Sequence, residues 1–167
     1  YILCATYYYV FFVSCKKVTK PVKTDLKEIA KEIMMEAKNC ALITVDSLGV
    51  AHARAMDPFL PQKDFTVWLG TNARSAKVGQ IQQNKLVTLY YFDAKSASYV
   101  TLQGVVYLVN TQKEKEKFWK TEWEDFYKNK ETDYLLLKFK PNKATIISEK
   151  YNILGDSISW ETPTIKF

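Results

Sequence analysis

The stretch Gly70-Thr71-Asn72-Ala73-Arg74-Ser75-Ala76-Lys77 lies between an apolar run and a short helical pattern. The residues before it, 65–69, alternate in polarity and are rich in β-forming side chains, so they predict a strand. After it, apolar side chains recur at helical spacing as far as Asn84, with Ser75 placed to cap the helix. A strand that leads into a helix brings unpaired backbone N–H groups and the positive end of the helix dipole to one point. With its hydroxyl and basic side chains, the stretch predicts a phosphate-binding turn.

Composition places the chain among ordinary globular proteins. Its 167 residues suffice for one domain with a core and are few for two. An aromatic content of 14% favours β-structure. The net charge is +6, much of it from lysines near the front of the chain. Because no arginine-rich stripe or basic–aromatic interleaving appears, composition argues against nucleic-acid binding.

The front of the chain is distinct from the rest. Residues 1–13 are almost wholly apolar, yet the run is shorter than the roughly 20 residues of a membrane-spanning helix. It ends in a small residue, then Cys15 and lysines, which is similar to the end of a bacterial lipoprotein signal, although no charged segment precedes it. On this interpretation residues 1–23 are a leader and tether, and a lipid on Cys15 anchors the domain formed by residues 24–167 to a membrane. The alternative is a tail that packs on the domain of a cytoplasmic protein.

The sequence gives little support for a catalytic nucleophile or a metal site. Beyond the leader the chain has one cysteine, Cys40, in an apolar run where a small core residue is expected, and one histidine, His52. These cannot build a disulfide framework or a metal site. A catalytic triad would need that single histidine as its base.

The pattern along the chain predicts an α+β fold, an antiparallel six-stranded β-barrel with flanking helices. Gly104, in the middle of the longest strand, predicts a bulge or a close backbone approach. Lys113 to Lys117 are expected to form a solvated helix face. The aromatic side chains that follow are expected to pin that helix to the barrel. Helices are expected over 24–38, 76–84 and 112–129, and strands over 40–45, 50–56, 65–70, 86–92, 99–109, 134–139 and 144–147.

A polar turn can also bind nothing, so the order of the neighbouring motifs matters. Arg54-Ala55-Met56 ends one predicted strand, and residues 68–77, 81–91 and 99–104 follow in that order. This series resembles the pyridoxamine 5'-phosphate oxidase-like FMN-binding split barrels, most closely the general stress protein branch, over about residues 26–167. The resemblance implies a split barrel, a homodimer with FMN at the subunit interface, and a small-molecule redox substrate.

The resemblance also implies the cofactor site. The FMN phosphate is held by an arginine at the end of the second strand and by hydroxyl and lysine side chains of the turn. A planar guanidinium and a point charge together offset the roughly two negative charges of a phosphate. Tyr99 occupies a position that touches the flavin of the other subunit. The positions assigned to the cofactor are Arg54, Ala55, Met56, Asp57, Gly70, Thr71, Ser75, Lys77 and Tyr99.

Departures from the family pattern restrict the reaction. Phe59 stands where vitamin B6 oxidases carry a lysine, and the last residues, 159–167, lack the arginine and histidine that bind their substrate. The resemblance therefore favours an FMN-dependent oxidoreductase of unknown substrate over pyridoxamine phosphate oxidation. The alternatives are a stress-related module that binds FMN without catalysis, or a split barrel that holds haem or a deazaflavin. The scarcity of histidine argues against haem ligation.

Overall fold

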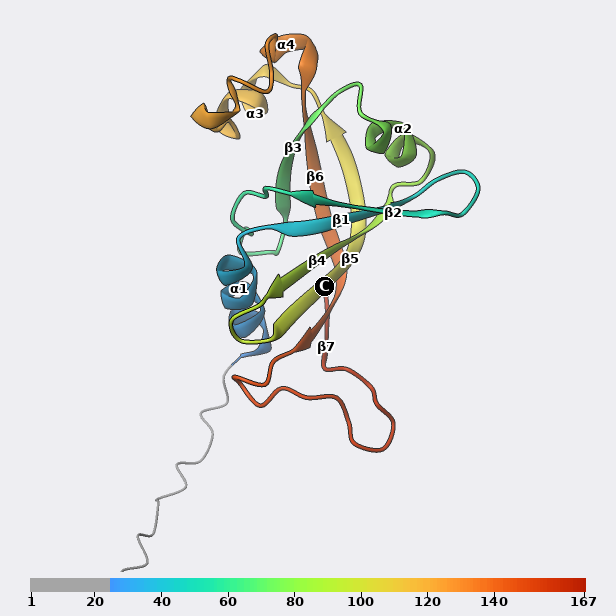
Figure 1. The fold of residues 1–167 in the computed structure, drawn as a ribbon, viewed down its shortest axis with the longest axis vertical. Helices are drawn as coiled ribbons and strands as arrows, with labels where there is room; N and C mark the ends of the chain where they lie inside the picture. Colours follow the sequence, from blue (N-terminus) through green and yellow to red (C-terminus); the bar gives the residue numbers. More distant parts are fainter. Residues whose placement is uncertain (1–24) are drawn as a thin grey trace, which may run out of the picture.

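The computed structural model describes residues 25–167, so the predictions for residues 1–23 and Cys15 lie outside the described residues. One antiparallel sheet runs in the order β2-β1-β4-β5-β6-β3, with β7 beside β6 (Figure 1). This confirms the predicted α+β fold; six strands form the path and β7 adds a short seventh. The strands are β1 (Cys40–Val45), β2 (Ala51–Met56), β3 (Val67–Asn72), β4 (Leu86–Asp93), β5 (Ser98–Val109), β6 (Tyr134–Ile147) and β7 (Thr164–Lys166). The helices are α1 (Leu26–Ala37), α2 (Ala76–Gln83), α3 (Gln112–Lys117) and α4 (Lys130–Asp133), with a 3₁₀ turn η1 (Thr121–Trp123).

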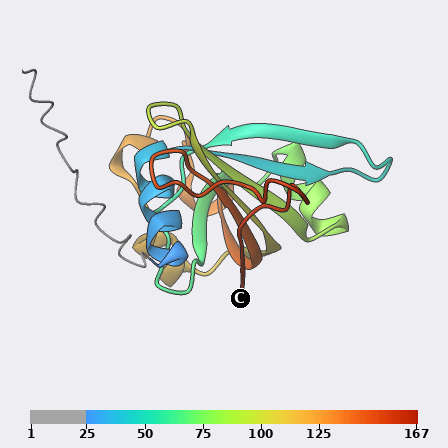
Figure 2. The ribbon, with the colours of Figure 1, turned by 90° about the horizontal axis from the view of Figure 1, so that it is seen from below.

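The two ends of this path meet directly after β2. The Phe59 N–H donates to the Trp68 carbonyl at 2.9 Å, and Pro58 bridges to Leu69 on β3. The barrel therefore closes over a short stretch and stays open elsewhere. In Figure 2 the hairpin of β1 and β2 extends past the body of the barrel.

Helix α1 closes one end of the core as its apolar periodicity predicts. Asp25 caps it by accepting a hydrogen bond from the Lys27 N–H at 3.0 Å. Its buried side chains contact β4 and β5, and they are Ile29, Ala30, Ile33 and Met34. No helix within residues 25–167 is long and apolar enough to span a membrane.

One strand, β6, replaces the predicted pair of strands around Pro141. The register of β5 against β6 shifts between Gln103 and Gly104, and Gly104 lies opposite Pro141. A Cβ on Gly104 would overlap the Lys140 carbonyl oxygen and lie 2.7 Å from the Pro141 Cα. The missing N–H of proline is tolerated because the bulge already interrupts the ladder there. The bulge predicted at Gly104 is confirmed, whereas the prediction of two separate strands around Pro141 was wrong.

The predicted helix over residues 112–129 was also wrong. Helix α3 ends at Lys117, and the chain then turns so that Phe118 stacks on Trp68 with ring centroids 4.3 Å apart. Trp123 and Tyr127 both contact Tyr134, which a single straight helix could not arrange together with Phe118. Aromatic packing across the sheet overrides local helix propensity here.

Lys115 departs from the predicted solvated face. It is buried, and its ammonium group donates to the Glu131 carbonyl at 2.7 Å. Lys115 thereby ties α3 to the segment that leads into β6.

Candidate functional site

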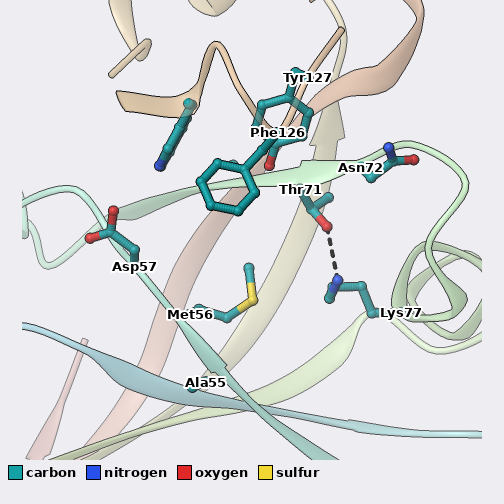
Figure 3. A pocket seen from close by; sticks show the side chains of 10 residues that line it. Ala55, Met56, Asp57, Thr71, Asn72, Lys77, Phe126 and Tyr127 are labelled. Atoms are coloured by element: carbon teal, nitrogen blue, oxygen red, sulfur yellow. Dashed lines mark hydrogen bonds between the residues drawn. The ribbon is translucent and has the colours of Figure 1, made fainter. Parts of the chain in front are cut away.

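A cavity of about 410 Å³ opens between the end of β2, the end of β3, the start of α2 and the segment after α3. Its size lies within the range of small-ligand sites. Cationic and hydroxyl groups line one side and aromatic rings line the other (Figure 3). The lining residues are Ala55, Met56, Asp57, Gly70, Thr71, Asn72, Lys77, Trp123, Phe126 and Tyr127.

The polar corner of the cavity joins β3 to α2. The Lys77 ammonium group donates to the Thr71 hydroxyl at 3.0 Å, and that hydroxyl lies 3.2 Å from the Ser75 hydroxyl. Strand β3 ends at Asn72, two residues later than predicted, so Thr71 is held rigidly in the strand. Ser75 occupies the predicted cap position of α2, but its side chain makes no capping bond. The Val78 N–H donates to the Ser75 carbonyl at 2.9 Å, which leaves the N–H groups of Ala76 and Lys77 to serve a ligand.

Arg54 lies behind this corner and does not line the cavity. Its guanidinium donates to the Thr44 hydroxyl at 2.7 Å and to the Gln80 side-chain oxygen at 3.1 Å. Burial, together with the positive charge of Arg54, lowers the pKa of Lys77. Among residues 25–167 neither cation forms an ion pair. The corner thus holds two close positive charges without an acidic partner, an arrangement that favours a bound anion.

Arg74 is not part of this corner, although the motif contains it. Its side chain is 78% exposed and pairs with Asp133 at 2.9 Å. Asn72 takes its place at the cavity and also accepts a hydrogen bond from the Arg74 N–H at 2.9 Å.

The opposite end of the cavity is aromatic. Residues 118–127, called the aromatic segment, contribute Trp123, Phe126 and Tyr127 to the lining, and Figure 3 shows Phe126 and Tyr127 above Met56. Asp57 lies beside them and pairs with Lys120 at 2.6 Å. Gly70 permits this arrangement, since a Cβ there would overlap the Trp123 ring.

Tyr99 does not reach the cavity of its own chain. It lies on the face of the sheet opposite the core, where its ring is 5.6 Å from that of Tyr90. A shallow groove on that face is lined by Ala55 and Arg54 together with Tyr90 and Phe92. Because Ala55 borders both hollows, the cavity adjoins the outer face of the sheet.

Sequence reasoning missed the aromatic wall of the cavity. It assigned those side chains to the core, as is correct for Trp123, which is 8% exposed. Phe126, however, is 73% exposed. The available signal was the density of rings at positions 118, 119, 123, 126 and 127, which cannot all face one side of a helix.

Other reactive groups offer no separate centre within the described residues. Burial raises the pKa of the Cys40 thiol to about 12, so it is not a nucleophile. His52 contacts Asp46 at 2.8 Å in the β1–β2 hairpin, away from the cavity. No cluster of three potential metal ligands occurs among residues 25–167.

Fold and cavity together define an antiparallel split barrel with a pocket that is cationic at one end and aromatic at the other. The chain belongs to the pyridoxamine 5'-phosphate oxidase like family, whose sequence profile matches residues 25–159. No curated protein sequence matches the chain.

Solved structures show the same fold. A Clostridium acetobutylicum protein related to general stress protein 26 of B. subtilis, of the pyridoxine phosphate oxidase family, superposes with a TM-score of 0.68 and 20% identity, covering 84% of this chain and 94% of that one. General stress protein 26 from Bacillus anthracis superposes with a TM-score of 0.67 and 21% sequence identity, covering 85% of this chain and 98% of that one. A pyridoxamine 5'-phosphate oxidase-related, FMN binding protein from Nostoc punctiforme superposes with a TM-score of 0.60 and 13% sequence identity, covering 84% of this chain and 93% of that one.

Proposed function

We propose that this protein is an FMN-binding flavoprotein that acts as an oxidoreductase on a small molecule. The observation that carries the proposal is a cationic corner at one end of a cavity whose other end is aromatic: Lys77 lines that corner and Arg54 lies behind it. A phosphate and a planar ring joined by a short chain are complementary to these two ends. The Nostoc relative, an FMN binding protein, supports the choice of ligand.

The donor set fits a flavin phosphate. Lys77 and the hydroxyls of Thr71 and Ser75 would hold the phosphate oxygens, and Arg54 would add a second positive charge behind them. Met56 and Ala55 would lie along the flavin ring or its ribityl chain. Asp57 and Gly70, which also line the cavity, would border the same part of the cofactor. Bound FMN supplies the redox chemistry, so the protein's part is to bind and orient it.

The proposed substrate is not pyridoxamine phosphate. Phe59 packs against Phe118 and Trp123, with ring centroids 5.2 and 5.6 Å away, and offers no charge for a substrate phosphate.

The proposal includes a homodimer. The outer face of β2, β1, β4 and β5 carries apolar side chains that no described element covers; Phe92 is 50% and Leu86 is 61% exposed. Ile43, Tyr90 and Tyr99 share this face. A second copy packed there would cover it and, because Ala55 adjoins both hollows, would border the flavin. Tyr99 of one chain would then contact the flavin of the other.

Ligand identification by mass spectrometry tests the cofactor assignment. Protein purified natively, or reconstituted from the ligand-free form, is expected to be yellow and to carry one FMN per chain. Haem, a deazaflavin, or no uptake at all would each contradict the proposal.

A non-catalytic FMN carrier is the second candidate. The observation in its favour is that Asp57, the acidic residue lining the cavity, is paired with Lys120 and so poorly placed for proton transfer. Steady-state assays with NAD(P)H and several electron acceptors separate the two. A carrier would show no turnover above that of free FMN.

A further inference from the structure

We propose that Phe126 is the stacking position for an uncharged, planar, ring-bearing substrate of the quinone or heteroaromatic class. The inference rests on the proposed function, since it concerns a second ligand bound over the flavin. It concerns Phe126 in particular, because the flavin ring proposed for the aromatic end would lie along Met56 and leave Phe126 for a second ring.

Phe126 differs from the other rings of the aromatic segment. Trp123 is 8% exposed and packs within the cluster, whereas Phe126 is 73% exposed although it lines the cavity. Figure 3 shows its ring above Met56, between Asp57 and Thr71. No aromatic side chain among residues 25–167 stacks on it. An exposed ring at a cavity mouth gains most when another flat apolar surface covers it.

The position of Phe126 is held from several sides. The N–H groups of Phe126 and Tyr127 both donate to the Trp123 carbonyl, at 3.0 and 3.1 Å. Trp123 in turn rests on Gly70, and Lys120 fastens the aromatic segment to Asp57. A backbone held this way keeps the Phe126 side chain at the cavity, so less ordering is needed when a ligand stacks on its ring.

Charge selects the kind of ligand. At the aromatic end, the carboxylate of Asp57 is neutralised by the ammonium group of Lys120 at 2.6 Å. Lys77, with Arg54 behind it, lies at the other end, where the flavin phosphate would use both charges; neither forms an ion pair among residues 25–167. Met56 offers the opposite wall for the flavin ring, which leaves Phe126 for a second ring. An uncharged planar compound therefore fits the remaining space better than a phosphorylated or sugar-like one.

The test uses FMN-loaded protein and 2-methyl-1,4-naphthoquinone as the probe. Its dissociation constant is measured by equilibrium dialysis for the wild type, Phe126→Ala and Phe126→Tyr. Leu60→Ala is the matched control, because Leu60 is 72% exposed and lies outside the cavity. Phe126→Ala is expected to weaken naphthoquinone binding about tenfold, while Phe126→Tyr and Leu60→Ala stay within about twofold. FMN affinity is titrated separately for every variant.

The outcomes are distinguishable. Weaker naphthoquinone binding with unchanged FMN affinity supports the inference. Equal naphthoquinone affinity in the wild type and Phe126→Ala, or no binding to the wild type, overturns it and leaves FMN binding intact. Loss of FMN affinity itself in Phe126→Ala would assign the ring to the flavin and also overturn it. A wild type that takes up no FMN removes the proposed function together with this inference.

Discussion

The Lys77 ammonium group donates to the Thr71 hydroxyl at 3.0 Å and so joins the first turn of α2 to the end of β3. Lys77 is half-buried, and both burial and the nearby charge of Arg54 lower its pKa. Without an anion, the two cations repel each other at this corner. A bound phosphate would relieve that repulsion, which makes the corner the most direct point at which to test the cofactor site.

Replacing Lys77 or Arg54 with Ala is expected to weaken FMN binding by about 1.5–3 kcal/mol, or roughly 10- to 150-fold, because each removes a charged partner of the phosphate. Fluorescence titration of ligand-free protein with FMN measures the effect. Arg74→Ala is the control, since Arg74 lies in the same motif but is exposed and pairs with Asp133. Unchanged affinity in both test variants would remove the phosphate assignment.

FMN affinity is expected to fall as the pH rises from 7 to 10. Burial and the charge of Arg54 hold the pKa of Lys77 in the free protein below its usual value, so Lys77 loses its proton at a lower pH than an ordinary lysine does. Phosphate binds the protonated form, and binding at high pH must therefore be accompanied by proton uptake. Dissociation constants across this range measure the trend. The Lys77→Arg variant, which stays charged, should show a much flatter profile, and parallel profiles would contradict the role of Lys77.

Gly70 and Gly79 offer a matched pair for stability. Gly70→Ala is expected to destabilise the protein by about 1–3 kcal/mol, because its Cβ would meet the rings of Trp123 and Tyr134. Gly79 lies within α2 with open space around it, so Gly79→Ala is expected to stabilise by about 0.5–1 kcal/mol. Urea denaturation followed by circular dichroism measures both. A neutral Gly70→Ala would show that Trp123 moves aside freely.

Phe92→Glu is expected to separate the proposed dimer, because it places a charge in the apolar outer face of the sheet. Light scattering after size exclusion should then give the mass of one chain, 19.4 kDa for the sequence as given. Leu60→Glu adds the same charge away from that face and should leave the dimer intact. A monomeric wild type would contradict the dimer outright.

The leader is tested in the full-length precursor. If Cys15 carries the lipid anchor, Cys15→Ser should move the protein from the membrane fraction to the soluble fraction. Cys4→Ser, within the apolar run, is the control. Equal partition of Cys15→Ser and the wild type would favour the tail that packs on the domain.

Much of the fold could be predicted from the sequence because its patterns are local. Two strand-forming runs over residues 40–45 and 50–56 around a polar turn are enough to predict a hairpin, and β1 and β2 have nearly those bounds. Likewise, an apolar stripe behind Asp25 specifies α1. The turn at residues 70–77 also combined its hydroxyls and Lys77 as expected, because neighbouring residues at the end of a strand and the start of a helix cannot lie far apart.

Tertiary structure alone decided the features that depend on distant partners. Strand β6 passes through Pro141 because Gly104, some forty residues earlier, accommodates it. The helix expected over 112–129 ends at Lys117 because Trp68 and Tyr134 draw the aromatic rings to the sheet. That same packing leaves Phe126 over the cavity and turns Arg74 outward to Asp133. By itself the sequence determined the split barrel and its candidate phosphate corner. The aromatic end of the pocket arose only from long-range packing, which no local periodicity encodes.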